Sequence, residues 1–163
     1  MVQIKMADGG IIKLKLRPDV APITVANFEK LVGEGFYNGL IFHRVIAGFM
    51  VQGGDPTGTG MGGSPENIKG EFSMNGVPNN ISHKRGVISM ARTQVPNSAS
   101  SQFFICYDDA SFLDGNYAAF GKVIEGMETV DAFLDVERRP NSMGEMASPV
   151  TPIVMEEVII IEE

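Results

Sequence analysis

The stretch FHRVIAGFMVQGGD, residues 42–55, is the densest cluster of unusual residues in the chain. It overlaps residues 40–46, a run of aromatic and β-branched residues that predicts a β-strand. Runs of the same kind recur, separated by Gly, Pro and Asn, at residues 87–90, 103–106 and 117–123. Many short strands and few helices favour a closed sheet, because closure hides strand edges that would otherwise template aggregation.

The two ends of the chain predict further strands. Residues 12–17, IKLKLR, alternate apolar and basic side chains, which places the aliphatic ones on one buried face. Residues 2–6 are the expected partner strand, because Asp8 and Gly9 tolerate the positive φ of a tight hairpin. A final strand is expected at residues 153–161.

Two helices are predicted between the strands. The first begins at Pro22, which suits a first helical turn, and its apolar residues recur at helical spacing: Val25, Phe28 and Val32. The second is expected at residues 127–136, bounded by Gly126 and Pro140. Residues 55–65 and 72–85 lack periodicity and are interpreted as surface loops near a functional site. Residues 141–152 are interpreted as one more loop.

Composition restricts the class of protein. The 163 residues are 44% apolar, enough for one core, so residues 1–163 are expected to form one domain. A net charge of −7 works against attraction to phosphate backbones, so no nucleic-acid partner is expected. The longest apolar run, residues 103–107, is far too short to span a bilayer. The N-terminus lacks a secretory signal, and Cys106 is the single cysteine, which together favour the cytoplasm. No heptads are present, so a monomer is expected.

Three ordered blocks resemble the signature of the cyclophilins: residues 42–55, SQFFIC at 101–106, and FLDG at 112–115 leading to FGKV at 120–123. The resemblance extends over nearly the whole chain. It implies an eight-stranded antiparallel barrel capped by two helices. It also implies peptidyl-prolyl cis-trans isomerase activity without metal or organic cofactor, acting on Xaa-Pro-containing peptides and on unfolded or folding proteins.

The resemblance also implies the roles of individual residues. Arg44 matches the catalytic arginine, and Gly60 lies on a loop beside a neighbouring subsite. The proline pocket and its polar lining correspond to Phe49, Met50, Phe104, Leu113, Gln52 and Gln102. Ala91 and Arg92 fall where the family presents backbone groups to an extended peptide.

Three positions depart from the family pattern. Phe112 replaces a tryptophan whose indole N–H hydrogen-bonds cyclosporin in many members, so weakened cyclosporin binding is expected. Tyr117 replaces a histidine, which keeps an aromatic wall but changes the polarity of the pocket. Arg92 stands where asparagine is usual.

The chemistry of the isomerisation suits an arginine. The prolyl nitrogen recovers its lone pair in the twisted transition state, so a donor aimed at that nitrogen stabilises the transition state more than either ground state. Arg44 would be such a donor and is permanently charged. Desolvation of the amide in the apolar pocket would supply a second contribution.

Other interpretations remain open from the residues alone. A non-catalytic module or a holdase chaperone could bind proline-containing chains through the same groove. Cys106 with His43 or His83 could suggest a thiol nucleophile, but its apolar surroundings favour a buried structural cysteine. The glycines at residues 58–63 are not followed by the lysine of a phosphate-binding loop, so a flexible substrate loop is expected. With two His and one Cys that are not closely spaced, no zinc site is expected.

Overall fold

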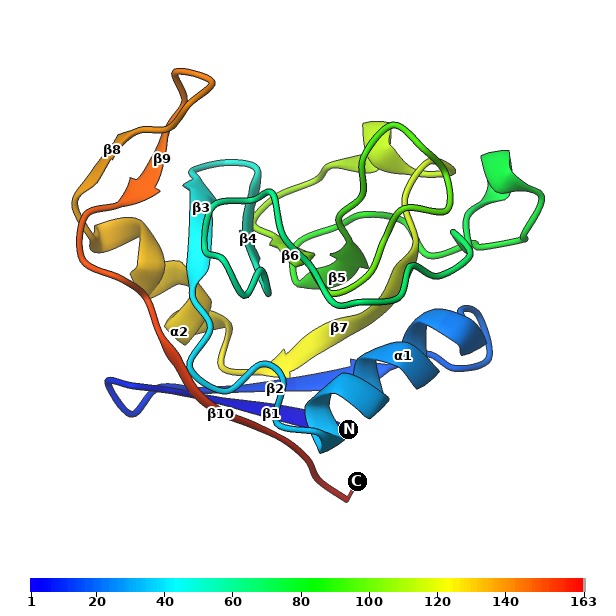
Figure 1. Ribbon diagram of the computed structural model, residues 1–163, viewed down its shortest axis with the longest axis horizontal. Helices are drawn as coiled ribbons and strands as arrows, with labels where there is room; N and C mark the ends of the chain where they lie inside the picture. Colours follow the sequence, from blue (N-terminus) through cyan, green and yellow to red (C-terminus); the bar gives the residue numbers. More distant parts are fainter. Residues whose placement is uncertain (163) are drawn as a thin grey trace.

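The computed structural model describes residues 1–162, and most of its strands form one antiparallel sheet (Figure 1). Eight strands are hydrogen-bonded in the order β10-β1-β2-β7-β5-β6-β4-β3. Their bounds are β1 Val2–Met6, β2 Ile11–Leu16, β3 Phe42–Ile46, β4 Met50–Gly53, β5 Val87–Met90, β6 Phe103–Cys106, β7 Ala119–Glu125 and β10 Met155–Ile160. The predicted mostly-β fold is therefore confirmed.

The opening hairpin follows from its alternation. Ile4 pairs with Ile12, and both side chains are buried in the core. In the turn, Gly9 has φ +95°, and the Asp8 carboxylate accepts the N–H of Gly10 at 2.9 Å. A residue with a Cβ would be strained at Gly9, so the turn selects glycine.

The two edge strands of the sheet, β10 and β3, meet just beyond their ends. Ile41 and Val154 form an antiparallel bridge. The N–H of Phe42 donates to Ile153 at 3.0 Å, and the N–H of Met155 donates to Leu40 at 2.9 Å. These bonds join the edges, so the sheet curls into a barrel with its apolar core inside.

Two α-helices, α1 Pro22–Gly33 and α2 Met127–Ala132, pack against this core. Phe28 of α1 meets Phe103 edge-to-face at 5.6 Å between ring centroids. The first turn of α1 is capped by the buried Glu71, whose carboxylate accepts the N–H of Thr24 at 2.6 Å and its hydroxyl at 2.7 Å. Glu71 thus satisfies a helix N–H that has no partner within the helix.

The C-terminal third differs from prediction. The second helix ends at Ala132, and one 3-10 turn, Phe133–Asp135, follows it, so the helix expected at residues 127–136 was too long. The loop expected at residues 141–152 was also wrong in part. It contains β9 Met146–Pro149, which pairs with β8 Arg138–Pro140 in a hairpin beside β3 (Figure 1). Neither strand alternates apolar and polar residues, because the hairpin buries little of its surface.

The stretch at residues 72–85 is not purely a surface loop. It contains a 3-10 turn, Ser73–Asn75, and it brings His83 to a fully buried position. Within residues 1–162, no helix combines the length and the apolar character needed to cross a membrane.

Candidate active site

Three neighbouring strands, β3, β4 and β6, present one row of side chains to the outside of the barrel. Arg44 of β3 pairs with Gln52 of β4, and Gln52 pairs with Phe104 of β6. Paired residues share a face of the sheet, whereas their sequence neighbours point to the other face. Val51 and Ile105 accordingly belong to the barrel core. Successive side chains of these strands therefore point alternately into the barrel core and toward the outer face, where a site can form.

A pocket of about 160 Å³ lies over this outer row. It is lined by Arg44, Phe49, Met50, Gln52, Ala91, Arg92, Phe104, Leu113 and Tyr117, all of them predicted site residues. Its apolar floor belongs to a second cluster of buried side chains, separate from the barrel core, that includes Met50, Phe104 and Cys106. The arrangement combines a dry floor with a cation at its edge.

The guanidinium of Arg44 is held on two sides. Its Nε donates to Oε1 of Glu145 at 3.0 Å, and one terminal nitrogen donates to Oε2 of the same carboxylate at 2.8 Å. The other terminal nitrogen donates to Oε1 of Gln52 at 3.1 Å. A bidentate pair with a carboxylate fixes the plane of the guanidinium as well as its position.

Glu145 was not predicted from the sequence. It lies in the turn between β8 and β9, where its carboxylate also accepts the side-chain N–H of Asn141 at 2.8 Å. Hydrogen bonds from Arg44, and a smaller contribution from Asn141, lower the pKa of Glu145 below its usual value despite partial burial. No motif marks this glutamate, because its contact with Arg44 joins residues 101 positions apart.

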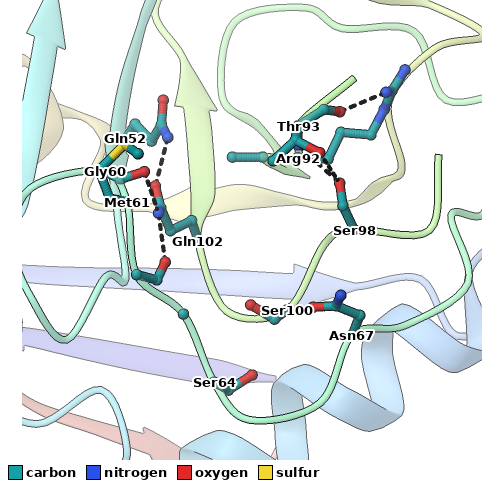
Figure 2. A pocket seen from close by; sticks show the side chains of 13 residues that line it. Gln52, Gly60, Met61, Ser64, Asn67, Arg92, Thr93, Ser98, Ser100 and Gln102 are labelled. Atoms are coloured by element: carbon teal, nitrogen blue, oxygen red, sulfur yellow. Dashed lines mark hydrogen bonds between the residues drawn. The ribbon is translucent and has the colours of Figure 1, made fainter. Parts of the chain in front are cut away.

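The remaining predicted glutamine connects the pocket to a second one. Gln52 donates to Gln102 at 2.8 Å, and Gln102 donates to the carbonyls of Gly60 and Gly62 at 2.9 and 2.8 Å. Figure 2 shows this chain of hydrogen bonds at one side of the second pocket, with Arg92, Thr93 and Ser98 on the other side. The second pocket measures about 350 Å³ and also contains Gly60. Gln52, Ala91 and Arg92 line both pockets.

The loop that carries Gly60 is tied to a buried carboxylate. Asp55 is 1% exposed and accepts the N–H groups of Thr57, Thr59, Gly60 and Gly62 at 2.7–3.1 Å. Burial raises the pKa of Asp55, but these hydrogen bonds outweigh it and lower the pKa to about 2. The glycine-rich loop was expected to be flexible, but these hydrogen bonds hold it against the barrel.

Behind the pocket, His83 supports Phe104. The imidazole stacks on the Phe104 ring, with centroids 5.9 Å apart. Its Nδ1 donates to Asp114 at 2.8 Å, and its Nε2 accepts the hydroxyl of Ser89 at 2.9 Å, as a neutral ring with its proton on Nδ1 would. Burial lowers the pKa of His83, although Asp114 opposes this effect. His83 was likewise absent from the predicted site.

Phe112, Tyr117 and Arg92, the three departures from the family pattern, each contact an aromatic ring at the rim of the site. Phe112 is 72% exposed, lies outside both pocket linings and stacks on Phe49 with centroids 5.7 Å apart. Tyr117 meets Phe104 edge-on at 5.8 Å. The guanidinium of Arg92 lies 4.9 Å from the Tyr117 ring centroid.

The alternative chemistries find little support. Cys106 is buried, and its burial raises the thiol pKa to about 12, so it is a poor nucleophile. His83 is committed to Asp114 and Ser89. Among the described residues, no cluster of His, Cys, Asp and Glu side chains could hold a metal ion.

Comparison with known proteins is consistent with this geometry. The profile of the family described as "Cyclophilin type peptidyl-prolyl cis-trans isomerase/CLD" matches residues 1–159. The chain is 47% identical over 143 residues to a probable peptidyl-prolyl cis-trans isomerase of Brucella suis, covering 80% of this chain and 69% of that protein. It is 49% identical over 123 residues to peptidyl-prolyl cis-trans isomerase B of Bacillus subtilis, covering 76% and 82%.

Solved structures show the same fold. A cyclophilin-type isomerase of Cryptosporidium parvum, crystallised in the presence of the dipeptide Ala-Pro, superposes with a TM-score of 0.87 at 33% identity, covering 99% of both chains. A cyclophilin of Hirschia baltica gives a TM-score of 0.76 at 28% identity, covering 97% of this chain and 72% of that one.

Proposed function

This chain belongs to the cyclophilin-type peptidyl-prolyl cis-trans isomerases, and we propose that it accelerates rotation about Xaa-Pro bonds by donating a hydrogen bond from Arg44 to the prolyl nitrogen. Isomerase activity is the activity of its family and of its named relatives. The role of Arg44 and of each pocket residue is the proposal, and the observation that carries it is the cation held at the edge of an apolar pocket.

The barrier arises from resonance in the amide. Resonance gives the C–N bond partial double-bond character, with a barrier of about 18–20 kcal/mol. Twisting the bond returns the lone pair to the prolyl nitrogen, so a donor there gains strength only as the transition state forms. No covalent bond breaks and no proton needs to be transferred.

Two features of Arg44 support this role. Its guanidinium has more N–H donors than Glu145 and Gln52 use, so donors remain for substrate. Both partners also fix its plane, so little ordering is left to do when substrate binds. A hydrogen bond to a charged donor contributes about 1.5–3 kcal/mol, or on the order of 10- to 100-fold in rate.

The apolar floor supplies the second contribution. Phe49, Met50, Phe104 and Leu113 would surround the proline ring and exclude water from the amide. The planar amide is more charge-separated than the twisted one, so removing water destabilises the ground state more. This contribution adds to the hydrogen bond.

The partners follow from the pocket. We propose that peptides and unfolded or folding proteins containing Xaa-Pro are the substrates, as the Ala-Pro dipeptide present with the Cryptosporidium relative suggests. Residues 1–163 would act as one monomeric domain. The buried, single cysteine suits a reducing compartment such as the cytoplasm.

The test is the cis-trans exchange rate of an Ala-Pro peptide, measured by NMR exchange spectroscopy with wild type, Arg44→Ala and Arg44→Lys at equal concentration. We expect rapid exchange with wild type, a loss of about tenfold or more with Arg44→Ala, and partial activity with Arg44→Lys, which keeps the charge but not the planar fork. Binding without acceleration by wild type would instead establish a proline-binding module. Aggregation suppression that survives Arg44→Ala would reveal a separate holdase role.

A further inference from the structure

The guanidinium of Arg92 makes several contacts, none of them with an acidic side chain among residues 1–162. It lies between two aromatic rings, 4.7 Å from the Phe72 centroid and 4.9 Å from that of Tyr117. Its Nε donates to the carbonyl of Asn116 at 2.9 Å, and a terminal nitrogen donates to that of Thr93 at 2.8 Å. Arg44, the other arginine of the proline pocket, has the Glu145 carboxylate within salt-bridge distance, whereas no carboxylate among residues 1–162 lies within that distance of Arg92.

Arg92 also lies where three hollows of the surface meet. It lines the proline pocket, the second pocket and a third, shallower hollow of about 360 Å³ that it shares with Thr93, Gln94 and Tyr117. No other residue lines all three. An extended chain whose proline occupies the first pocket therefore enters a hollow lined by Arg92 whichever of the other two it reaches.

The linings of these hollows carry no negative charge. Neither the proline pocket nor the two neighbouring hollows includes an Asp or Glu. Apart from Arg44, which is paired with Glu145, Arg92 is their only charged residue. This absence contrasts with a chain whose net charge is −7.

We propose that Arg92 is a specificity residue that selects substrates with a carboxylate side chain close to the Xaa-Pro bond. The Phe72 and Tyr117 rings that contact the guanidinium orient its free N–H donors. Binding of an Asp or Glu side chain therefore requires little further ordering of Arg92. The backbone carbonyls already bound to Arg92 carry no net charge, so they leave its positive charge uncompensated. The inference rests on the isomerase function proposed above and names a substrate class for it.

The test compares peptides that differ only in charge. The peptides contain one Xaa-Pro pair, and their termini are blocked so that no terminal carboxylate contributes. Glu, Gln or Lys is placed in turn at each of the two positions before and the two positions after the pair. Their kcat/KM values are measured at low and at high salt with wild type, Arg92→Gln and Arg92→Lys. Lys15→Gln serves as the control, because it removes the same charge from an exposed site on β2.

We expect wild type to prefer Glu over Gln by about threefold to tenfold in at least one position at low salt, and to disfavour Lys there. The preference should shrink at high salt, fall near unity in Arg92→Gln, persist in part in Arg92→Lys and stay unchanged in Lys15→Gln. A preference below about twofold at every position, or one that survives Arg92→Gln, overturns the proposal. Turnover of the Gln peptides reports separately on the isomerase function, which fails only if none of these peptides is turned over.

Discussion

Glu145 holds Arg44 through two parallel hydrogen bonds of 3.0 and 2.8 Å, from a hairpin turn 101 residues farther along the chain. Both side chains are about one-quarter to one-third exposed, at 24% and 30%, so water screens their attraction only in part. The contact leaves the position of Arg44 dependent on a segment outside the main sheet.

Replacing Glu145 by Gln should lower kcat more than it changes KM. The amide keeps one hydrogen bond but loses the charge and the bidentate fit, so the guanidinium samples orientations that do not face the prolyl nitrogen. We expect a fall of about threefold to tenfold in kcat, measured by NMR exchange at saturating and subsaturating peptide. Glu137→Gln, an exposed change just before β8, is the matched control. An unchanged kcat, or an effect on KM alone, would contradict the positioning role.

Phe112→Trp should tighten cyclosporin binding. Phe112 stacks on Phe49 at the rim and has no hydrogen-bond donor, whereas an indole in that place supplies one. One neutral hydrogen bond contributes about 0.5–1.5 kcal/mol, so we expect about a threefold to tenfold gain in affinity by calorimetry. Peptide exchange should change little, since Phe112 lies outside the pocket lining. Nanomolar affinity of the wild type would rule out this account.

Asp55→Asn should remove an acid-sensitive part of the stability. The pKa of Asp55 is lowered to about 2 in the folded protein, so its contribution is fully present above about pH 4 and is lost as the pH falls toward about 2. The shift corresponds to about 2 kcal/mol at neutral pH. Urea unfolding at pH 7 and pH 3 should show the variant less stable at pH 7, with a smaller gap at pH 3. A gap independent of pH would argue against the charged hydrogen bonds.

His83 should make the protein less stable in mild acid. Burial lowers its pKa in the folded state, so the unfolded chain binds a proton first as the pH drops below about 6.5. Stability is therefore present at neutral pH and declines until the folded-state pKa is passed. His43, whose pKa burial also lowers, acts in the same direction.

The measurement is the free energy of urea unfolding between pH 7.5 and pH 5 for wild type and His83→Gln. We expect a smaller decline in the variant, with part of the slope remaining because of His43. A matched variant, His43→Gln, should remove the other part. Equal slopes in wild type and His83→Gln would show that the buried imidazole does not titrate with folding.

Local patterns predicted most of the fold. The alternation at residues 12–17 and the apolar spacing of Val25, Phe28 and Val32 report directly on the face that each element buries. The outer row of β4 and β6 has no such pattern, because residues 49–51 and 103–106 are uninterrupted apolar runs, and the assignment of Met50 and Phe104 to the pocket rests on the resemblance. Resemblance was needed for the number of strands and for closure, since pairing between distant strands leaves no local pattern.

Long-range polar contacts could not be predicted. Glu145 lies in a stretch whose sequence has no helical or strand periodicity and therefore predicts a loop. Its partner is known only once the β8–β9 hairpin has been placed beside β3. His83 lies in an aperiodic stretch, and only the fold shows that its ring is buried against Phe104. Burial statistics place Glu mostly at the surface and give His only intermediate burial, so residue type indicates neither contact.

The first strand of the barrel pairs with the last, with Val2 opposite Ile160. Translation delivers these partners far apart in time, because β1 and β10 are widely separated in the sequence and the ribosome adds about 5–20 residues per second. A nascent chain on the ribosome therefore keeps one edge of β1 open, and that edge can pair with other strands until β10 emerges. Because Glu145 emerges 101 residues after Arg44, Arg44 acquires its full set of partners only once that turn has been synthesised. The active site of this isomerase is thus assembled only after the β8–β9 hairpin has been synthesised.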